Sequence, residues 1–332
     1  MFYNFNESIN KEIALYYNER YFNILEIHLP ESNSVILERF KKFIDNRGSD
    51  EKYIIRLGNE SFHRVEQKQF VENLIDEYSN MGYDIILSTS SINKSTYEFH
   101  PLTNLHLHWK ELEQRRDLSW KTSDSIEAFP QSMYDYNKEL VFDKSIKSIL
   151  SVRKTSNYRK YLFDNVTQDD NSILRYADYT FGKWTETQDD INRSIQFPTW
   201  YELLDEYNKS IFAFIYETEH THDSSLDCQI SEKTIKAMLS GNIPIVLGQY
   251  KFPKYIEEMG LFIANDDFGF NDSIDFEERL NSFIDVYNNI KTLSFDESKN
   301  KWLAYQSKIQ KNYDVISNLL FRNWDEESKN IK

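Results

Sequence analysis

Short apolar segments of β-prone residues alternate with amphipathic segments along most of the chain, and this alternation constrains the fold more than any other feature. In the first third of the sequence the apolar segments lie at 21–29, 52–57 and 83–87. The stretches between them carry apolar residues at helical spacing. Short strands separated by helices predict a parallel sheet with helices on both faces. The sequence therefore predicts an α/β fold.

The same alternation starts again after residue 141 and predicts a second α/β domain. Strands are expected at 148–152, 210–216, 243–247 and 261–264, and helices at 232–240, 253–259 and 274–290. The pattern breaks up between residues 93 and 142, which indicates the connection between the domains. We therefore expect an N-terminal domain at 1–140, a second domain at 141–300 and a long amphipathic terminal helix within 301–332.

Composition and charge exclude several classes of protein. The 332 residues are 40% hydrophobic and 15% aromatic, with only 8 Gly and 6 Pro, so a sizeable core is available and collagen-like or low-complexity chains are excluded. The 54 acidic and 39 basic side chains give a net charge of −15. A charge of this sign disfavours nucleic acid as a partner unless a local basic site exists.

The sequence predicts a cytoplasmic protein without a membrane span. No apolar run approaches the roughly 20 residues that cross a bilayer. The N-terminus lacks the basic region followed by an apolar region that marks a signal peptide. The single cysteine, Cys228, has no internal partner for a disulfide, which suits a reducing compartment.

Positive charge is concentrated at residues 144–183, where eight basic and four acidic side chains give a local charge of +4. Arg153 and Lys154 directly follow the expected strand at 148–152. Ligands of open α/β sheets gather beyond the carboxyl ends of strands, so these two side chains are candidates to bind an anion such as a phosphate. Arg159 and Lys160, on the next expected helix, either join them or form a solvated basic face.

A second candidate site lies at the start of the helix expected at 232–240. Ser231 is a typical N-cap residue, so Glu232 and Lys233 fall in the first helical turn. Free N–H groups and the positive end of the helix dipole favour a phosphate there, and Lys233 adds charge. Glu232 can accept hydrogen bonds from both hydroxyls of a ribose. The alternative is a structural helix start with a capping glutamate and an exposed lysine.

Residues 210–218, followed by 231–248 (SEKTIKAMLSGNIPIVLG), resemble the donor-binding signature of fucosyltransferase-like glycosyltransferases. The upstream segment 148–159 is similar to a strand and Arg-rich turn in phage and bacterial glycosyltransferases. The resemblance covers about residues 146–265, whereas the N-terminal part matches only in its α/β alternation. The connection between Glu217 and Glu232 is longer here than in the fucosyltransferase pattern.

This resemblance implies a GT-B architecture, in which two Rossmann-like domains face a cleft and a C-terminal helix crosses back. It implies that Glu232 contacts the ribose of a nucleotide sugar and that Lys233 and Arg153 contact its pyrophosphate. Glu217 is implied to lie near the donor sugar or near the helix start. In such enzymes the general base comes from the N-terminal domain.

The candidates for that base are Glu60 and His63, which follow the strand at 52–57, and also His100, His106 and His108. The alternative is that they are ordinary polar loop residues. The pairs His106/His108 and His220/His222 have spacings compatible with a metal, but no further pair with the spacing of a structural zinc site accompanies them. No Asp-x-Asp, Gly-x-Gly-x-x-Gly or P-loop pattern occurs, so we expect no metal and no cofactor besides the nucleotide-sugar co-substrate.

Together these patterns predict a metal-independent glycosyltransferase that moves a sugar from a nucleoside-diphosphate donor to a hydroxyl acceptor, on a glycan or a similar molecule. One alternative is a phage-type enzyme that glycosylates modified DNA bases. The other is a non-catalytic binding or scaffold protein that keeps the fold. The sequence leaves open the donor sugar, the acceptor and the stereochemistry of transfer.

Overall fold

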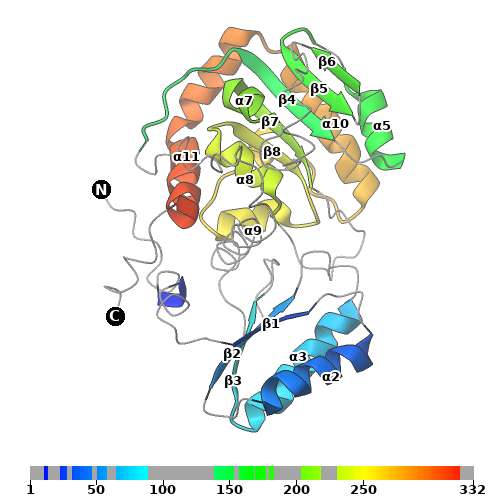
Figure 1. Ribbon diagram of the computed structural model, residues 1–332. Helices are drawn as coiled ribbons and strands as arrows, with labels where there is room; N and C mark the ends of the chain where they lie inside the picture. The colour runs from blue at the N-terminus through cyan, green and yellow to red at the C-terminus, as the bar shows by residue number, and fades with distance from the viewer. Residues whose placement is uncertain are drawn as a thin grey trace, which may run out of the picture. The chain divides into compact units, whose positions relative to one another are not determined.

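The computed structural model describes residues 11–13, 23–27, 32–46, 51–57, 65–88, 138–152, 157–167, 169–176, 179–182, 203–217 and 230–321. The chain divides into two compact units (Figure 1). Unit 1 comprises Met1–Ser132, Ser225–Gln229 and Leu319–Lys332. Unit 2 comprises Met133–Ser224 and Ile230–Asn318. The predicted α/β class is confirmed, because each unit contains a sheet with parallel strands and helices that pack on it.

Unit 1 contains a three-stranded parallel sheet in the order β1-β2-β3. Its described elements are β1 (Asn23–Ile27), α2 (Asn33–Asp45), β2 (Lys52–Leu57), α3 (Val65–Asn80) and β3 (Asp84–Ser88). Helix α2 connects β1 to β2 and helix α3 connects β2 to β3, which is the arrangement that the alternating sequence pattern predicts.

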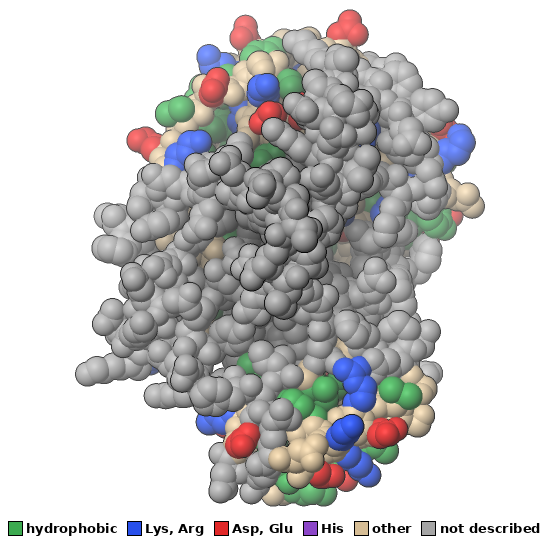
Figure 2. Space-filling model, viewed as in Figure 1, with side chains coloured by type: hydrophobic (Ala, Val, Ile, Leu, Met, Phe, Trp, Pro, Cys, Tyr) green, Lys and Arg blue, Asp and Glu red, His purple; other side chains and the backbone are tan. Residues whose placement is uncertain are grey.

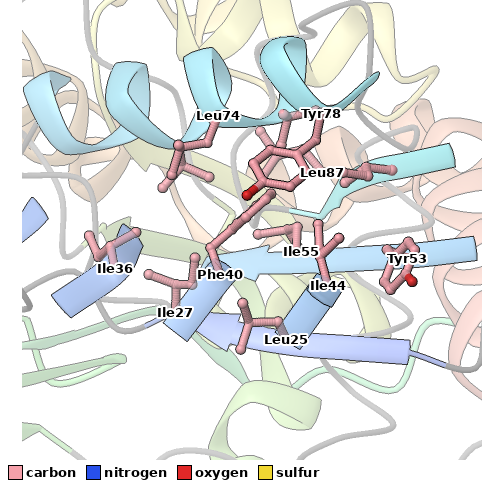
Figure 3. Close-up of a cluster of buried hydrophobic side chains, with 13 residues drawn as sticks. Leu25, Ile27, Ile36, Phe40, Ile44, Tyr53, Ile55, Leu74, Tyr78 and Leu87 are labelled. Carbon is pink, nitrogen blue, oxygen red and sulfur yellow. The ribbon is translucent and has the colours of Figure 1, made fainter. Parts of the chain in front are cut away.

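The core of unit 1 lies between the sheet and helices α2 and α3 (Figure 3). Phe40 of α2 packs edge-on against Tyr78 of α3, with 5.1 Å between the ring centres. Tyr53 and Ile55 of β2 belong to this cluster. Ile54, which points to the opposite face because strand side chains alternate, is also buried. The middle of the strand is therefore buried on both faces, which explains why Tyr53, Ile54 and Ile55 are all apolar.

Unit 2 contains a five-stranded sheet in the order β6-β5-β4-β7-β8, parallel except for the β5–β6 pair. The strands are β4 (Ile146–Val152), β5 (Ser172–Tyr176), β6 (Tyr179–Gly182), β7 (Ser210–Tyr216) and β8 (Ile243–Leu247). The helices are α5 (Asn157–Asn165), α7 (Leu204–Lys209), α8 (Glu232–Leu239), α9 (Phe252–Glu258), α10 (Phe276–Thr292) and α11 (Phe295–Phe321), with a 3₁₀ turn, η3, at Asp266–Phe268.

Helices pack on both faces of this sheet. Phe214 of β7 contacts Phe283 and Tyr287 of α10, with ring centres 5.6 and 4.7 Å apart. The ring of Tyr216, which shares that face with Phe214, lies under Arg159 of α5. Glu217, one residue further on, instead binds α8. Helices α5 and α10 therefore pack on one face of the sheet and α8 on the other.

The strand expected at 261–264 is absent: these described residues form no strand. A single backbone bond, from Ala264 N–H to Pro244 O at 2.8 Å, joins them to β8. The side chain of Asn265 occupies the position that a strand would take, because its amide bonds both the N–H and the C=O of Val246 at 2.9 and 2.7 Å. Asn312 of α11 does the same for Phe262, at 2.7 Å for both bonds.

The expected terminal helix forms, but it begins at Phe295, before the start of the segment predicted for it. Within unit 2 it packs against the chain ahead of β4 and against the turn after α8. The indole N–H of Trp302 donates to Gly241 O at 2.8 Å, and the side chains of Gln306 and Gln310 bond both backbone groups of Leu140. Among the described helices, none combines the length and apolar character needed to cross a membrane.

Candidate functional site at the carboxyl edge of unit 2

The order of the strands in unit 2 reverses at the β4–β7 pair. From β4 the chain moves outward through β5 on one side, and it later returns to place β7 on the other side, followed outward by β8. Ligands of open α/β sheets bind beyond the carboxyl ends of the strands at such a reversal. Here those ends are Val152 and Tyr216. Arg153 and Lys154, which follow β4, lie outside the described residues.

Arg159 reaches this edge from α5. Its side chain is only 7% exposed, and the guanidinium carbon lies 5.0 Å from the centre of the Tyr216 ring, at the last residue of β7. The alternative of a solvated basic face is therefore wrong for Arg159. It holds for Lys160, which is exposed and pairs with Asp164 one helical turn further on. The two adjacent cations face different environments because they point in different directions from a short helix.

Burial raises the pKa of the Tyr216 phenol, and the charge of Arg159 partly opposes this rise. The phenol is therefore neutral at physiological pH. A neutral ring presents an electron-rich face to the guanidinium, which stabilises the cation in a position with little water. The stacked pair keeps a positive charge at the carboxyl end of β7.

A second arginine lies close to the same edge, and the sequence prediction missed it as a candidate. Arg175 is 8% exposed and lies on β5, paired with Ser151, one residue before the end of β4. The only indication in the sequence is that Arg175 lies near the end of the short apolar segment that forms β5. That signal is weak, because β5 itself was not predicted.

Glu217 lies directly after β7 and is 2% exposed. Its Oε1 accepts the N–H of Ser231 at 3.2 Å and the hydroxyl of Thr234 in the first turn of α8. Its own N–H donates to Leu247 O at 3.0 Å, which joins β7 to β8. Of the two places implied for this residue, the carboxylate is observed at the helix start, where a negative charge also complements the helix dipole.

The predicted start of α8 is confirmed. The hydroxyl of Ser231 accepts the N–H of Lys233 at 3.2 Å, which makes Ser231 the N-cap. Lys233 is half-buried in the first turn, so it is not the fully exposed lysine of the structural alternative. Glu232 is the first residue of α8, and its side chain lies outside the described part of the structure.

The two glycines of the 231–248 signature have structural reasons. Gly241 has φ +65, and a Cβ there would lie 3.1 Å from a methyl carbon of Leu140. Gly248 follows β8, and a Cβ there would lie 2.7 Å from the ring of Phe252. Both positions therefore require glycine for the packing of unit 2, irrespective of any ligand.

The candidates for the general base, Glu60, His63, His100, His106 and His108, lie outside the described residues, as do His220 and His222. Within the described residues no group of three or more His, Cys, Asp or Glu side chains could hold a metal ion. On the face shown in Figure 2, the basic and acidic side chains of the described residues are interspersed rather than gathered by sign.

The carboxyl edge of unit 2 therefore combines two buried guanidiniums, a capped helix start with Lys233, and a carboxylate that ties this helix to the sheet. Such an arrangement is suited to bind an anion with several oxygens. Comparison of the chain with protein-family models, with curated proteins and with solved structures gives no match.

Proposed function

We propose that the chain is a metal-independent glycosyltransferase that moves a sugar from a nucleoside-diphosphate donor to a hydroxyl acceptor. The observation that carries the proposal is the buried Arg159, stacked on Tyr216 at the carboxyl end of β7, where the strand order reverses. A diphosphate is the ligand that such a set of cations and helix N–H groups binds best. The resemblance of residues 146–265 to glycosyltransferases supports the same ligand.

In this proposal Arg159 and Lys233 bind the diphosphate, together with Arg153 and Lys154 after β4. Glu232 binds the ribose hydroxyls. When the bond to the sugar breaks, negative charge develops on the departing diphosphate, and fixed cations stabilise that charge without reorganisation of solvent. Glu217 keeps the start of α8 in place through Ser231 and Thr234.

We further propose that the two units correspond to the two Rossmann-like domains of a GT-B enzyme. The three parallel strands of unit 1 are compatible with half of such a domain. In this arrangement unit 1 supplies the general base, with Glu60 and His63 as the first residues to substitute. The base takes the proton of the acceptor hydroxyl as the new glycosidic bond forms.

Isothermal titration of nucleoside diphosphates into the protein tests the diphosphate site. Arg159→Lys keeps a charge but loses the forked donors, so we expect at least a tenfold loss of affinity. Lys233→Ala should produce a loss of similar size. Lys160→Ala is the matched control, because it removes the neighbouring exposed cation of the same helix.

The proposal fails if the wild-type protein binds no nucleoside diphosphate, or if all three variants bind it equally well. Hydrolysis of nucleotide sugars without acceptor distinguishes an enzyme from a scaffold protein that only binds the donor. A gel shift with duplex DNA that disappears at moderate salt would instead favour the DNA-modifying alternative.

A further inference from the structure

Gln249 lies in the turn after β8, next to the proposed diphosphate site. Leu247, the last residue of β8, pairs with Tyr216, and its carbonyl accepts the N–H of Glu217 at 3.0 Å. Gln249 follows Leu247 by two residues. The strand next to β8 is β7, and its last residue is Tyr216, the ring on which Arg159 is stacked.

The side chain of Gln249 is buried, and its amide has no hydrogen-bond partner among the described residues. It is 3% exposed, and in the described part of the chain neither its Nε2 nor its Oε1 has a hydrogen-bond partner. Folded proteins pair nearly all buried amides, because an unsatisfied donor or acceptor is costly away from water. Because Gln249 lies at the carboxyl edge of the sheet, where ligands bind, a ligand that forms hydrogen bonds with its amide would explain why the amide is left unpaired.

Asn265 shows what a structural amide looks like in the same place. It is fully buried, and its two polar atoms bond the N–H and C=O of Val246 in β8 at 2.9 and 2.7 Å. Gln249 and Asn265 carry the same functional group beside the same strand. The amide of Asn265 bonds the backbone of β8, whereas the amide of Gln249 has no hydrogen bond to another described residue.

The backbone on each side of Gln249 is fixed. On one side Gly248 packs so closely against Phe252 that a Cβ has no room. On the other, Lys251 adopts φ +68, a left-handed conformation that is unfavourable for a residue with a side chain, and its N–H donates to Asp272 Oδ2 at 2.8 Å. Such constraints are typical of turns that hold a functional group in place.

We propose that Gln249 determines the nucleobase specificity of the donor, with its amide bound to the edge of the base. This inference rests on the proposed function. A carboxamide presents one donor and one acceptor side by side in a plane, and the hydrogen-bonding edge of a nucleobase presents the complementary pair. A sugar hydroxyl offers both functions on a single atom, so it matches this geometry less well.

The first measurement is the thermal midpoint of the ligand-free protein. Gln249→Met keeps the length of the side chain and removes both polar atoms, so we expect an unchanged or higher midpoint. Asn265→Leu is the control, because it removes an amide of the same kind whose bonds are all made, and it should lower the midpoint. A decrease for Gln249→Met as large as that for Asn265→Leu would assign Gln249 to the fold and overturn the inference.

The second measurement is titration with UDP, GDP, ADP, CDP and inorganic pyrophosphate. We expect the wild-type protein to prefer one base at least tenfold, and Gln249→Met to lose this preference while its affinity for pyrophosphate stays the same. If Gln249→Met keeps the preference, only the role of Gln249 is refuted. If the wild-type protein binds none of the nucleoside diphosphates, the proposed function is refuted and the role of Gln249 with it.

Discussion

Replacement of Asn265 by leucine removes the side chain that pairs the outer edge of β8. Both backbone groups of Val246, a fully buried residue, then lose their partners. An unsatisfied buried donor or acceptor costs about 1–3 kcal/mol, so the two groups predict a loss of about 2–6 kcal/mol in the free energy of unfolding of unit 2. Leucine has the same number of side-chain heavy atoms and the same branching as asparagine, so no cavity forms, and its bulkier methyl groups can only add to the loss.

Denaturant unfolding measures this loss, and hydrogen exchange locates it. In the wild-type protein the Val246 amide should exchange slowly, and in Asn265→Leu it should exchange faster than the amides of β4. Asn165→Leu is the control: its side chain is exposed and donates to Tyr161 O in the same helix at 2.8 Å, so we expect a change within about 0.5 kcal/mol. A loss below about 1 kcal/mol for Asn265→Leu would refute the reasoning, since Val246 would then have found other partners.

Two further predictions concern unit 2. Burial lowers the pKa of Lys144 to about 7 from its ordinary 10.5. Between pH 7 and 10 the unfolded chain therefore binds more protons than the folded chain, so the free energy of unfolding rises with pH. Relative to Lys144→Met, the wild-type protein should gain about 1 kcal/mol of stability per pH unit in this range. Denaturant unfolding at pH 7, 8 and 9 measures the difference, and parallel curves for the two proteins would contradict it. Gly248→Ala should cost about 1–3 kcal/mol, because its Cβ meets the Phe252 ring at 2.7 Å. The same substitution should cost less in a Phe252→Ala background, which lacks the Cγ and Cδ2 atoms that the new Cβ meets; equal stability of Gly248→Ala and wild type would show that the ring moves freely.

The sequence predicted those strands of unit 2 that consist of continuous apolar residues, and it failed where polar side chains take part in the sheet. β4, β7 and β8 were predicted because buried parallel strands need apolar residues on both faces. β5 was missed because Arg175 interrupts its apolar residues, and β6 was missed because this edge strand has only four residues. The apolar run at 261–264 was wrongly predicted as a strand because the pairing there is made by two asparagine side chains, which no periodicity reveals.

The same limit applies to the site. The N-cap at Ser231 was predictable, because a hydroxyl before an amphipathic helix satisfies N–H groups of its own first turn. The burial of Arg159 was not, since it depends on Tyr216, which is 57 residues away in the sequence. Gln249 gave no signal for a similar reason: whether a buried amide is paired depends on residues that are distant in the sequence.

The members of the 231–248 signature divide into two groups by what they contact. Ser231 caps α8, Gly241 and Gly248 make room for Leu140 and Phe252, and Pro244 lies in β8, an edge strand, where a missing N–H costs least. These residues build a helix and a strand whether or not a ligand is bound. A scaffold protein that needed only the fold would keep them.

The distinction between an enzyme and a scaffold therefore rests on side chains other than this N-cap, these two glycines and this proline. Glu232 and Lys233 occupy a helix start that Ser231 already caps, so neither is needed to begin the helix. Arg159 is a large cation held beneath the surface, and a methionine of similar length would pack over Tyr216 without the cost of desolvating a charge. In the proposed function, a bound anionic diphosphate offsets this cost.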